Sequence, residues 1–209
     1  PAGVWIDRRA HKRENMIVAD LLRGLALATI PAAWWLGMLT IWHLLAVAFA
    51  VGALTVFFDL SSATFFVVLV HRSQFVDANS KLSTTRSLSY IAGPSTAGFL
   101  VQVFTAPVAL MADALSFVGS AIALRGVHVQ EPKVESKGTS ARSDLVEGFR
   151  YLARQPVLRA GVACTSIINF FSFFVFAIFV LYASRTLDLS AGVIGVVLGA
   201  ASIGALAGA

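Results

Sequence analysis

The chain has 209 residues, of which 57% are hydrophobic and only 13% are charged, and its formal net charge is +5. About a quarter of the residues of soluble globular proteins are charged, so this composition excludes an ordinary soluble domain. The single cysteine, Cys164, excludes an intrachain disulfide or a cysteine-based metal cluster, and we expect it to be a buried, inert thiol.

Six apolar stretches, each about long enough to cross a bilayer, fill most of the sequence. A helix needs about 20 predominantly apolar residues to span the hydrocarbon core. The expected spans are 16–36, 41–61, 87–104, 107–124, 160–182 and 191–209. We therefore predict an all-α membrane protein whose chain crosses the bilayer repeatedly.

The basic residues lie mainly on alternate connections between these spans. If residue 1 is cytoplasmic, 14 of the 16 Lys and Arg lie on cytoplasmic segments, and only Arg185 lies on the opposite side. Arg23, one turn inside the first span, is expected to snorkel to the cytoplasmic side or to pair with Asp20, three residues before it. This positive-inside bias predicts a multi-pass membrane protein with residue 1 and the 125–159 connection on the cytoplasmic side, and no nucleic-acid partner.

The segment before the first span carries a specific motif. GVWIDRRAHKR follows the pattern Gly-x-x-x-Asp-Arg with a basic pair after it, at Gly3, Asp7, Arg8, Lys12 and Arg13. It resembles motif A of the major facilitator superfamily, which lies in the loop between the second and third of twelve spans. The family spacing is usually Asp-Arg-x-x-Arg-Lys, so the basic pair here comes one residue late.

Between the second and third spans lies an apolar patch, 65–70, that is too short to cross a bilayer. We expect it to be buried or interfacial. Ser73 is expected to start a helix that continues into the third span.

The third span contains a second motif. SYIAGPSTAGF follows the pattern Gly-Pro-x-x-x-Gly, and the residues of interest in and before it are Arg86, Ser89, Gly93, Pro94 and Gly98. Proline removes one helical hydrogen bond and kinks the helix, while small residues allow another helix to approach closely. The pattern resembles motif C in the fifth span of the same family, which is associated with exporters that exchange substrate for protons. Ser89 and Ala97 stand where that motif commonly has glycine.

With these two motifs in register, the whole chain is similar to the third to eighth spans of the branch that contains macrolide-efflux-type and enterobactin-exporter-type proteins. The resemblance implies a partial major facilitator type helical bundle, and we expect further spans on both sides. Residues 1–124 would belong to the N-terminal half, 125–159 to a cytoplasmic linker with a surface helix from 143 to 154, and 160–209 to the C-terminal half. Gly195 and Gly199 predict close helix packing in the last span.

Two polar residues lie deep within expected spans. A charge near the bilayer centre costs about 2.5–3.5 kcal/mol on insertion scales, so it normally faces protein or water. Asp113 is therefore either a protonatable cavity residue or a carboxyl group that fixes helix packing. Asn169 lies among five phenylalanines, which either form an aromatic substrate pocket or face lipid and neighbouring helices.

Asp59 lies near the inner end of the second span. In the family an acid there pairs with the motif A arginine, so the resemblance implies an inner latch of Asp7, Arg8 and Asp59. Arg86, at the inner end of the third span, is an alternative partner for Asp59.

No enzyme motif is present: we find no Walker loop, no His or Cys cluster with metal-ligand spacing and no nucleophile elbow. We therefore expect no catalytic activity and no cofactor. The resemblance implies a secondary transporter in the lipid bilayer, in which proton influx drives export of a small drug-like or siderophore-like molecule. The alternatives are a non-transporting scaffold or sensor derived from the same fold, and the membrane domain of an ATP-driven exporter.

Overall fold

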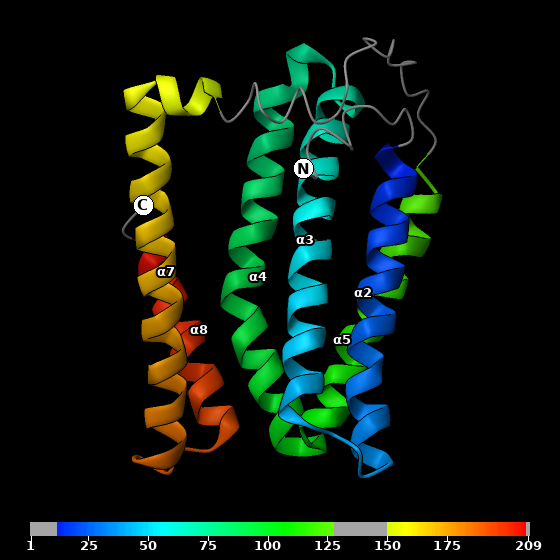
Figure 1. The fold of residues 1–209 in the computed structure, drawn as a ribbon, viewed down its shortest axis with the longest axis vertical. Helices are drawn as coiled ribbons and strands as arrows, with labels where there is room; N and C mark the ends of the chain where they lie inside the picture. The colour runs from blue at the N-terminus through cyan, green and yellow to red at the C-terminus, as the bar shows by residue number, and fades with distance from the viewer. Residues whose placement is uncertain (1–11, 128–149, 208–209) are drawn as a thin grey trace.

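The fold consists of long helices that run up and down beside one another. The computed structural model describes residues 12–127 and 150–207, and all structural statements below refer to these residues. The helices are α2 (Lys12–Trp35), α3 (Ile41–Leu69), α4 (Phe75–Phe104), α5 (Ala106–Arg125), α7 (Pro156–Arg185) and α8 (Ala191–Ala207), with a short 3-10 helix at Arg72–Gln74. The three short connections lie at the lower end of the molecule, and the α3–α4 connection lies at the upper end (Figure 1).

Four helices, α2, α3, α5 and α7, are long and apolar enough to cross a membrane. Helix α8 contributes only a shorter apolar part, Ala191–Ala201, which is not long enough to be counted with these four. The first turns of α4 are polar and contain Asp77 and Lys81, whose side chains form an exposed ion pair. Each of the six expected spans corresponds to one helix, so the prediction of an all-α, multi-pass membrane protein is confirmed, whereas α4 and α8 as membrane spans stay predictions.

The second expected span, 41–61, ends too early. Helix α3 continues without a break to Leu69, so the patch at 65–70 is its last turns and the following residue rather than a separate segment. Phe65 is buried, and the ring of Phe66 meets the ring of Phe75 edge to face at 5.7 Å. This contact joins α3 to α4 across the upper connection. The helix expected to start at Ser73 begins at Phe75, directly after the 3-10 helix that contains Ser73.

The best-packed part of the structure is formed by α2, α3 and α5. Its apolar centre consists of Leu27, Ile30, Val47 and Ala114. Gly24 lets α5 approach α2 closely, because a Cβ added there would lie only 2.9 Å from the carbonyl oxygen of Ala114. We refer to these three helices as the α2–α3–α5 body.

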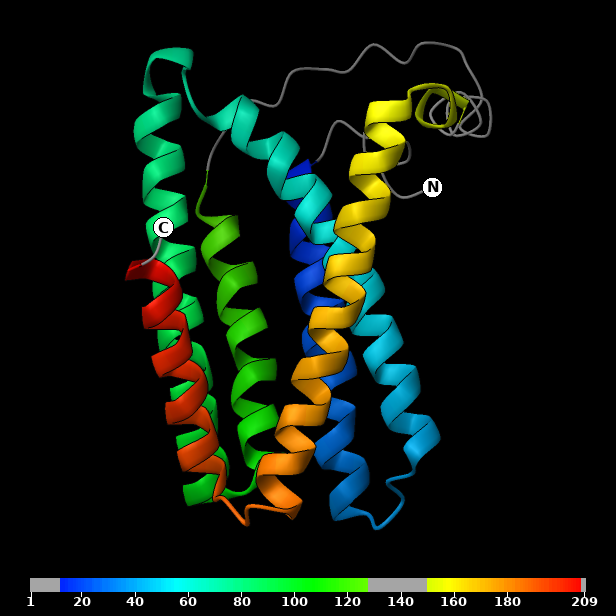
Figure 2. The same cartoon turned by 90° about the vertical axis from the view of Figure 1, so that its left-hand side faces the viewer.

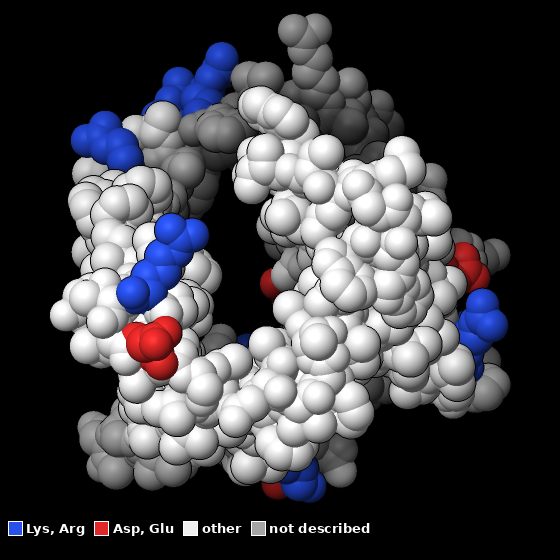
Figure 3. All heavy atoms as spheres, turned by 90° about the horizontal axis from the view of Figure 1, so that it is seen from below, with Lys and Arg blue, Asp and Glu red and all other residues white. Residues whose placement is uncertain are grey.

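Helix α4 contacts both α5 and α8, and Figure 2 shows α8 lying alongside α4. Helix α7 contacts α8 only sparsely, and Ala183 is its one buried residue. Seen from the lower end, the molecule has a hollow through its centre and a largely uncharged surface (Figure 3). The described helices therefore comprise a three-helix body, an α4–α8 pair and the loosely attached α7.

Candidate functional site

Arg23 lies inside the α2–α3–α5 body. It forms an ion pair with Asp20, and both side chains are buried. The guanidinium carbon lies 4.4 Å from the ring centre of Phe58 and 4.7 Å from that of Phe117, close enough for cation–π attraction. The hydroxyl of Ser120 donates a hydrogen bond of 2.6 Å to the Asp20 carboxylate. The predicted ion pair is confirmed, whereas the expected snorkelling of Arg23 is wrong, because the protein interior compensates its charge.

Asp113 borders a groove between α4 and α5. The groove has a volume of about 770 Å³ and is lined mainly by small residues, including Ser89 and Gly93 from α4 and Ser116 from α5. The Ser116 hydroxyl donates to the backbone carbonyl of Asp113 at 2.7 Å and lies 3.4 Å from the carboxylate. No Lys or Arg lines this groove, and within the described residues the Asp113 carboxylate forms no ion pair. Such an acid can take up a proton or bind a cationic group without competition from a fixed cation.

Two glycines bring α4 and α8 into backbone contact. A Cβ added to Gly98 would lie 3.0 Å from the Cα of Gly195, and one added to Gly195 would lie 3.1 Å from the Cα of Gly98. The second of these would also collide with the carbonyl oxygen of Pro94. The hydroxyl of Ser95 donates to the carbonyl of Gly195 at 3.2 Å. The expected close approach of another helix to this motif is confirmed.

At the lower end of the α4–α8 pair, Gln102 joins the two helices by hydrogen bonds. Its side-chain oxygen accepts from the backbone N–H of Gly192 at 2.9 Å and from the hydroxyl of Ser190 at 3.3 Å. The first N–H groups of a helix have no partner within the helix, so Gln102 satisfies one of those of α8.

The residues of the Gly-Pro motif fall on two faces of α4. Pro94 and Gly98 face α8, whereas Ser89 and Gly93 line the groove that contains Asp113. A Cβ added to Gly93 would meet no atom within 4 Å, so this glycine leaves open space in the groove. One helix thus carries both a packing surface and a cavity wall.

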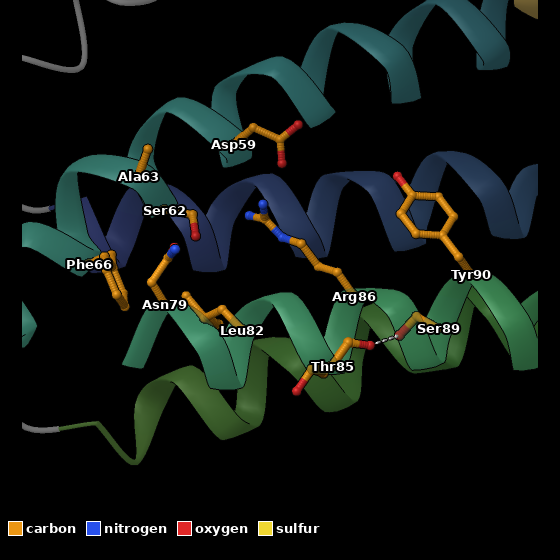
Figure 4. A pocket seen from close by; sticks show the side chains of 10 residues that line it. All are labelled: Asp59, Ser62, Ala63, Phe66, Asn79, Leu82, Thr85, Arg86, Ser89 and Tyr90. Carbon is orange, nitrogen blue, oxygen red and sulfur yellow. Dashed lines mark hydrogen bonds between the residues drawn. The ribbon is translucent and has the colours of Figure 1, made fainter. Parts of the chain in front are cut away.

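A more polar cleft lies between α3 and α4. Its volume is about 850 Å³, and Asp59 from α3 and Arg86 from α4 project into it from opposite walls (Figure 4). Each lies about three helical turns from the α3–α4 connection. The two residues face each other but form no ion pair, and neither is paired with any other residue that the structure describes. The sequence offered Arg86 as an alternative ion-pair partner for Asp59, and the structure shows no such pair.

Asn169 and Cys164 both lie exposed on α7. The side-chain amide of Asn169 donates to the carbonyl of Thr165 at 2.9 Å. An apolar cavity between α7 and α8 is lined by Phe171 and Phe176, but Asn169 is not among its lining residues. The expectation of a buried Cys164 is wrong, because α7 has so few contacts with the other described helices.

Most of motif A lies outside the described residues, namely Gly3, Asp7 and Arg8. Lys12 and Arg13 begin α2, and Arg13 donates to the carbonyl of Val127 at 2.7 Å. This bond ties the start of α2 to the end of α5. Of the expected surface helix at 143–154, only residues 150–154 are described, and these are helical.

Sequence reasoning missed several residues that join helices, among them Ser95, Gln102 and Ser120. Each of these three is a polar residue in a mainly apolar stretch. Its polarity among apolar neighbours was the one feature of the sequence that could have pointed to a contact between helices. Their partners are a backbone carbonyl, a backbone N–H and a buried carboxylate on other helices. Such partners cannot be identified until the helices are placed beside one another.

Comparison with known proteins gives one match. The family model of the Major Facilitator Superfamily matches residues 1–209. No curated protein and no solved structure matches the chain.

Proposed function

The chain belongs to the major facilitator superfamily, a family of secondary transporters, and on this premise we propose that it exports a small amphipathic molecule in exchange for protons. The branch we favour is that of macrolide-efflux-type and enterobactin-exporter-type proteins. The membrane would be the bacterial cytoplasmic membrane, with the 125–159 connection on the cytoplasmic side.

In this proposal α2 to α5 belong to one half of the transporter and α7 and α8 to the other. Transporters of this kind expose a central site alternately to each side by rocking one half against the other. The α4–α8 contact would then be a contact between halves. Its glycines support this role, because two backbones in direct contact can tilt without first separating interlocked side chains.

The observation that carries the proton-coupling proposal is the position of Asp113. Its carboxylate borders a groove of about 770 Å³ that contains no Lys or Arg. An ionised carboxylate in an apolar site is costly, so protonation and substrate binding would compete for the same group. The volume is within the range of about 300–1,000 Å³ that is usual for small-molecule sites.

The inner gate would be the latch of Asp7, Arg8 and Asp59 that the motif A resemblance implies. One observation on Asp59 supports this latch. Among the described residues Asp59 has no ion-pair partner, so its carboxylate is available to pair with Arg8. Arg86 would face this gate from α4.

The full-length protein in proteoliposomes tests the proposal, with rhodamine 6G as the transported probe and an imposed pH gradient as the driving force. Asp113→Asn should abolish gradient-driven uptake while leaving insertion and purification unchanged. Asp77→Asn is the matched control, because it makes the same change in an exposed ion pair of α4. Uptake that persists in Asp113→Asn at the level of the control would reject the proton-coupling role.

A further inference from the structure

We propose that the groove between α4 and α5 binds lipophilic amines in their protonated form and discriminates against quaternary ammonium ions. The ammonium group lies beside Asp113, and its N–H groups donate to Asp113 and Ser116. This inference rests on the proposed function, because it names the class of molecule that competes with protons at Asp113. It adds a requirement that charge alone does not impose, namely that the cation carries N–H groups.

The first argument is the charge of the groove. Among the described residues that line it, Asp113 is the only charged one. A neutral ligand would leave the carboxylate without a counter-charge, and an anionic ligand would be repelled by it. A cation neutralises Asp113, so the groove selects cations.

The second argument is the direction of the hydroxyl hydrogens. The Ser116 hydroxyl donates to the backbone carbonyl of Asp113 at 2.7 Å, and its oxygen lies 3.4 Å from the Asp113 carboxylate. A hydroxyl has one hydrogen and two lone pairs, so the Ser116 oxygen is left as an acceptor beside the carboxylate. A ligand placed there must bring the donors. A protonated amine brings N–H groups, whereas a quaternary ammonium ion has none.

The third argument comes from the opposite wall. Thr105 is the single residue between α4 and α5, and Thr96 and Asp113 lie nine and eight residues from it. At about 1.5 Å per residue, Thr96 on α4 lies at nearly the same height as Asp113 on α5. The Thr96 hydroxyl lines the groove and can accept a hydrogen bond. Asp113, Ser116 and Thr96 therefore provide acceptors from both walls, enough for the three N–H groups of a primary ammonium.

The lining below Asp113 identifies the rest of the ligand. Between Asp113 and the Thr105 connection the groove is lined by apolar side chains, including Leu100, Val101 and Leu110. This part is about 12 Å long, from eight residues at about 1.5 Å each. It can hold an aromatic or aliphatic group attached to the ammonium. Rhodamine 6G belongs to this class, because it is a cation with secondary N–H groups and an apolar ring system.

Three fluorescent probes with one dye test the requirement for N–H groups on the purified full-length protein in detergent. Dansylcadaverine carries a primary ammonium, its N,N,N-trimethyl derivative carries the same charge without N–H groups, and its N-acetyl derivative is neutral. We expect dansylcadaverine to bind at least about tenfold more tightly than the trimethyl derivative, because hydrogen bonds to charged groups are lost. The acetyl derivative should bind most weakly.

The trimethyl probe makes the outcome unambiguous. Its methyl groups add apolar surface, so a site that recognised only charge and apolar area would bind it at least as tightly as dansylcadaverine. Equal or tighter binding of the trimethyl derivative would therefore overturn the proposal.

A variant assigns the N–H contact to Ser116. Ser116→Ala should weaken dansylcadaverine about tenfold and leave the trimethyl derivative unchanged, because it removes an acceptor and keeps the charge of Asp113. Ser184→Ala is the matched control, since the Ser184 hydroxyl also donates to the carbonyl three residues earlier, at 3.1 Å, but does not line the groove. Identical binding by the two variants would overturn the assignment to Ser116.

Thr96→Val provides a second test if Ser116→Ala does not purify as a monodisperse protein. Valine has almost the same shape as threonine without the hydroxyl, so the same selective loss of dansylcadaverine binding is expected. Undiminished preference for dansylcadaverine in both variants would contradict the acceptor set.

The outcomes separate this inference from the proposed function. Equal affinity for the primary and trimethyl probes, with gradient-driven uptake still abolished in Asp113→Asn, would reject the selectivity for N–H groups alone. Uptake that persists in Asp113→Asn while the wild type still prefers dansylcadaverine would reject the proton-coupling role alone.

Discussion

The side-chain oxygen of Gln102 lies 2.9 Å from the backbone nitrogen of Gly192, so a residue near the end of α4 caps the first turn of α8. The bond joins two helices that are about ninety residues apart in the chain. It lies at the same end of the molecule as the connections at 36–40 and 186–190 (Figure 1). At that end, separation of α4 from α8 requires this bond to break.

Gln102→Ala should lower the thermal stability of the purified full-length protein. Removal of a helix cap costs about 0.5–2 kcal/mol, because the N–H group loses its acceptor. The measurement is the monodisperse fraction that remains after heating, followed by size-exclusion chromatography. Gln102→Glu keeps an acceptor in place and should stay close to the wild type. An alanine variant as stable as the glutamate variant would show that the cap contributes nothing.

Gly195→Ala should separate α4 from α8. The added Cβ would meet the carbonyl oxygen of Pro94 and approach the Cα of Gly98 to 3.1 Å, so α8 must shift. Overpacking of this kind costs about 1–3 kcal/mol. Gly52→Ala is the control, since its Cβ would meet no atom within 4 Å and alanine favours helix. Melting temperature and transport rate should both fall in Gly195→Ala only, and equal behaviour of the two variants would contradict the contact.

Asp20→Asn should destabilise the α2–α3–α5 body. It leaves the charge of Arg23 buried without its partner, and breaking a buried ion pair costs about 3–5 kcal/mol. Asp77→Asn breaks an exposed pair, which is worth about 0–1 kcal/mol, and serves as the comparison. The melting temperatures of the two variants in detergent provide the measurement. Similar small losses in both would mean that the buried pair contributes little.

Asp7→Asn should strongly reduce transport while leaving membrane insertion intact. The proposed latch needs the negative charge to hold Arg8 at the inner side, and asparagine has almost the same shape without the charge. The measurement is probe efflux from cells, normalised to the amount of protein in the membrane. Unchanged efflux would remove Asp7 from the gate.

Cysteine labelling should place the two ends of the helices on opposite sides of the membrane. Cys164 is exposed and must first be replaced. In that background we expect Ser73→Cys to react with an impermeant maleimide only from the cytoplasm, and Met38→Cys and Leu187→Cys only from outside. All three are exposed. Labelling of Ser73→Cys and Met38→Cys from one side would contradict the positive-inside orientation.

The helices could be predicted because bilayer-length apolar runs, short connections and alternating basic charge are local properties of the sequence. Helix ends were less predictable. The end of α3 was set too early, at 61, because Ser61, Ser62 and Thr64 interrupt the apolar run. In a helix such a hydroxyl can be satisfied by an earlier carbonyl, as the bonds from Thr64 to Leu60 and Ser61 at 3.0 and 2.9 Å show, whereas the buried hydroxyl of Ser61 has no hydrogen-bond partner among the described residues.

Contacts between helices were harder to infer. The Asp20–Arg23 pair follows from a spacing of three residues, but nothing local indicates that Phe58 and Phe117 enclose the guanidinium. The spacing of small residues indicated that another helix would approach α4, but not that Gly98 would face it while Gly93 faced away. Those distinctions depend on the rotation of α4 about its axis, which its neighbours fix.

The division of the Gly-Pro motif between two faces of α4 has a consequence for protein engineering. Substitutions at Ser89 and Gly93 would alter the space beside Asp113 and leave the glycine contact with α8 untouched. If the groove beside Asp113 holds the substrate, as we propose, a library restricted to that face would vary the range of accepted compounds and keep the α4–α8 contact unchanged.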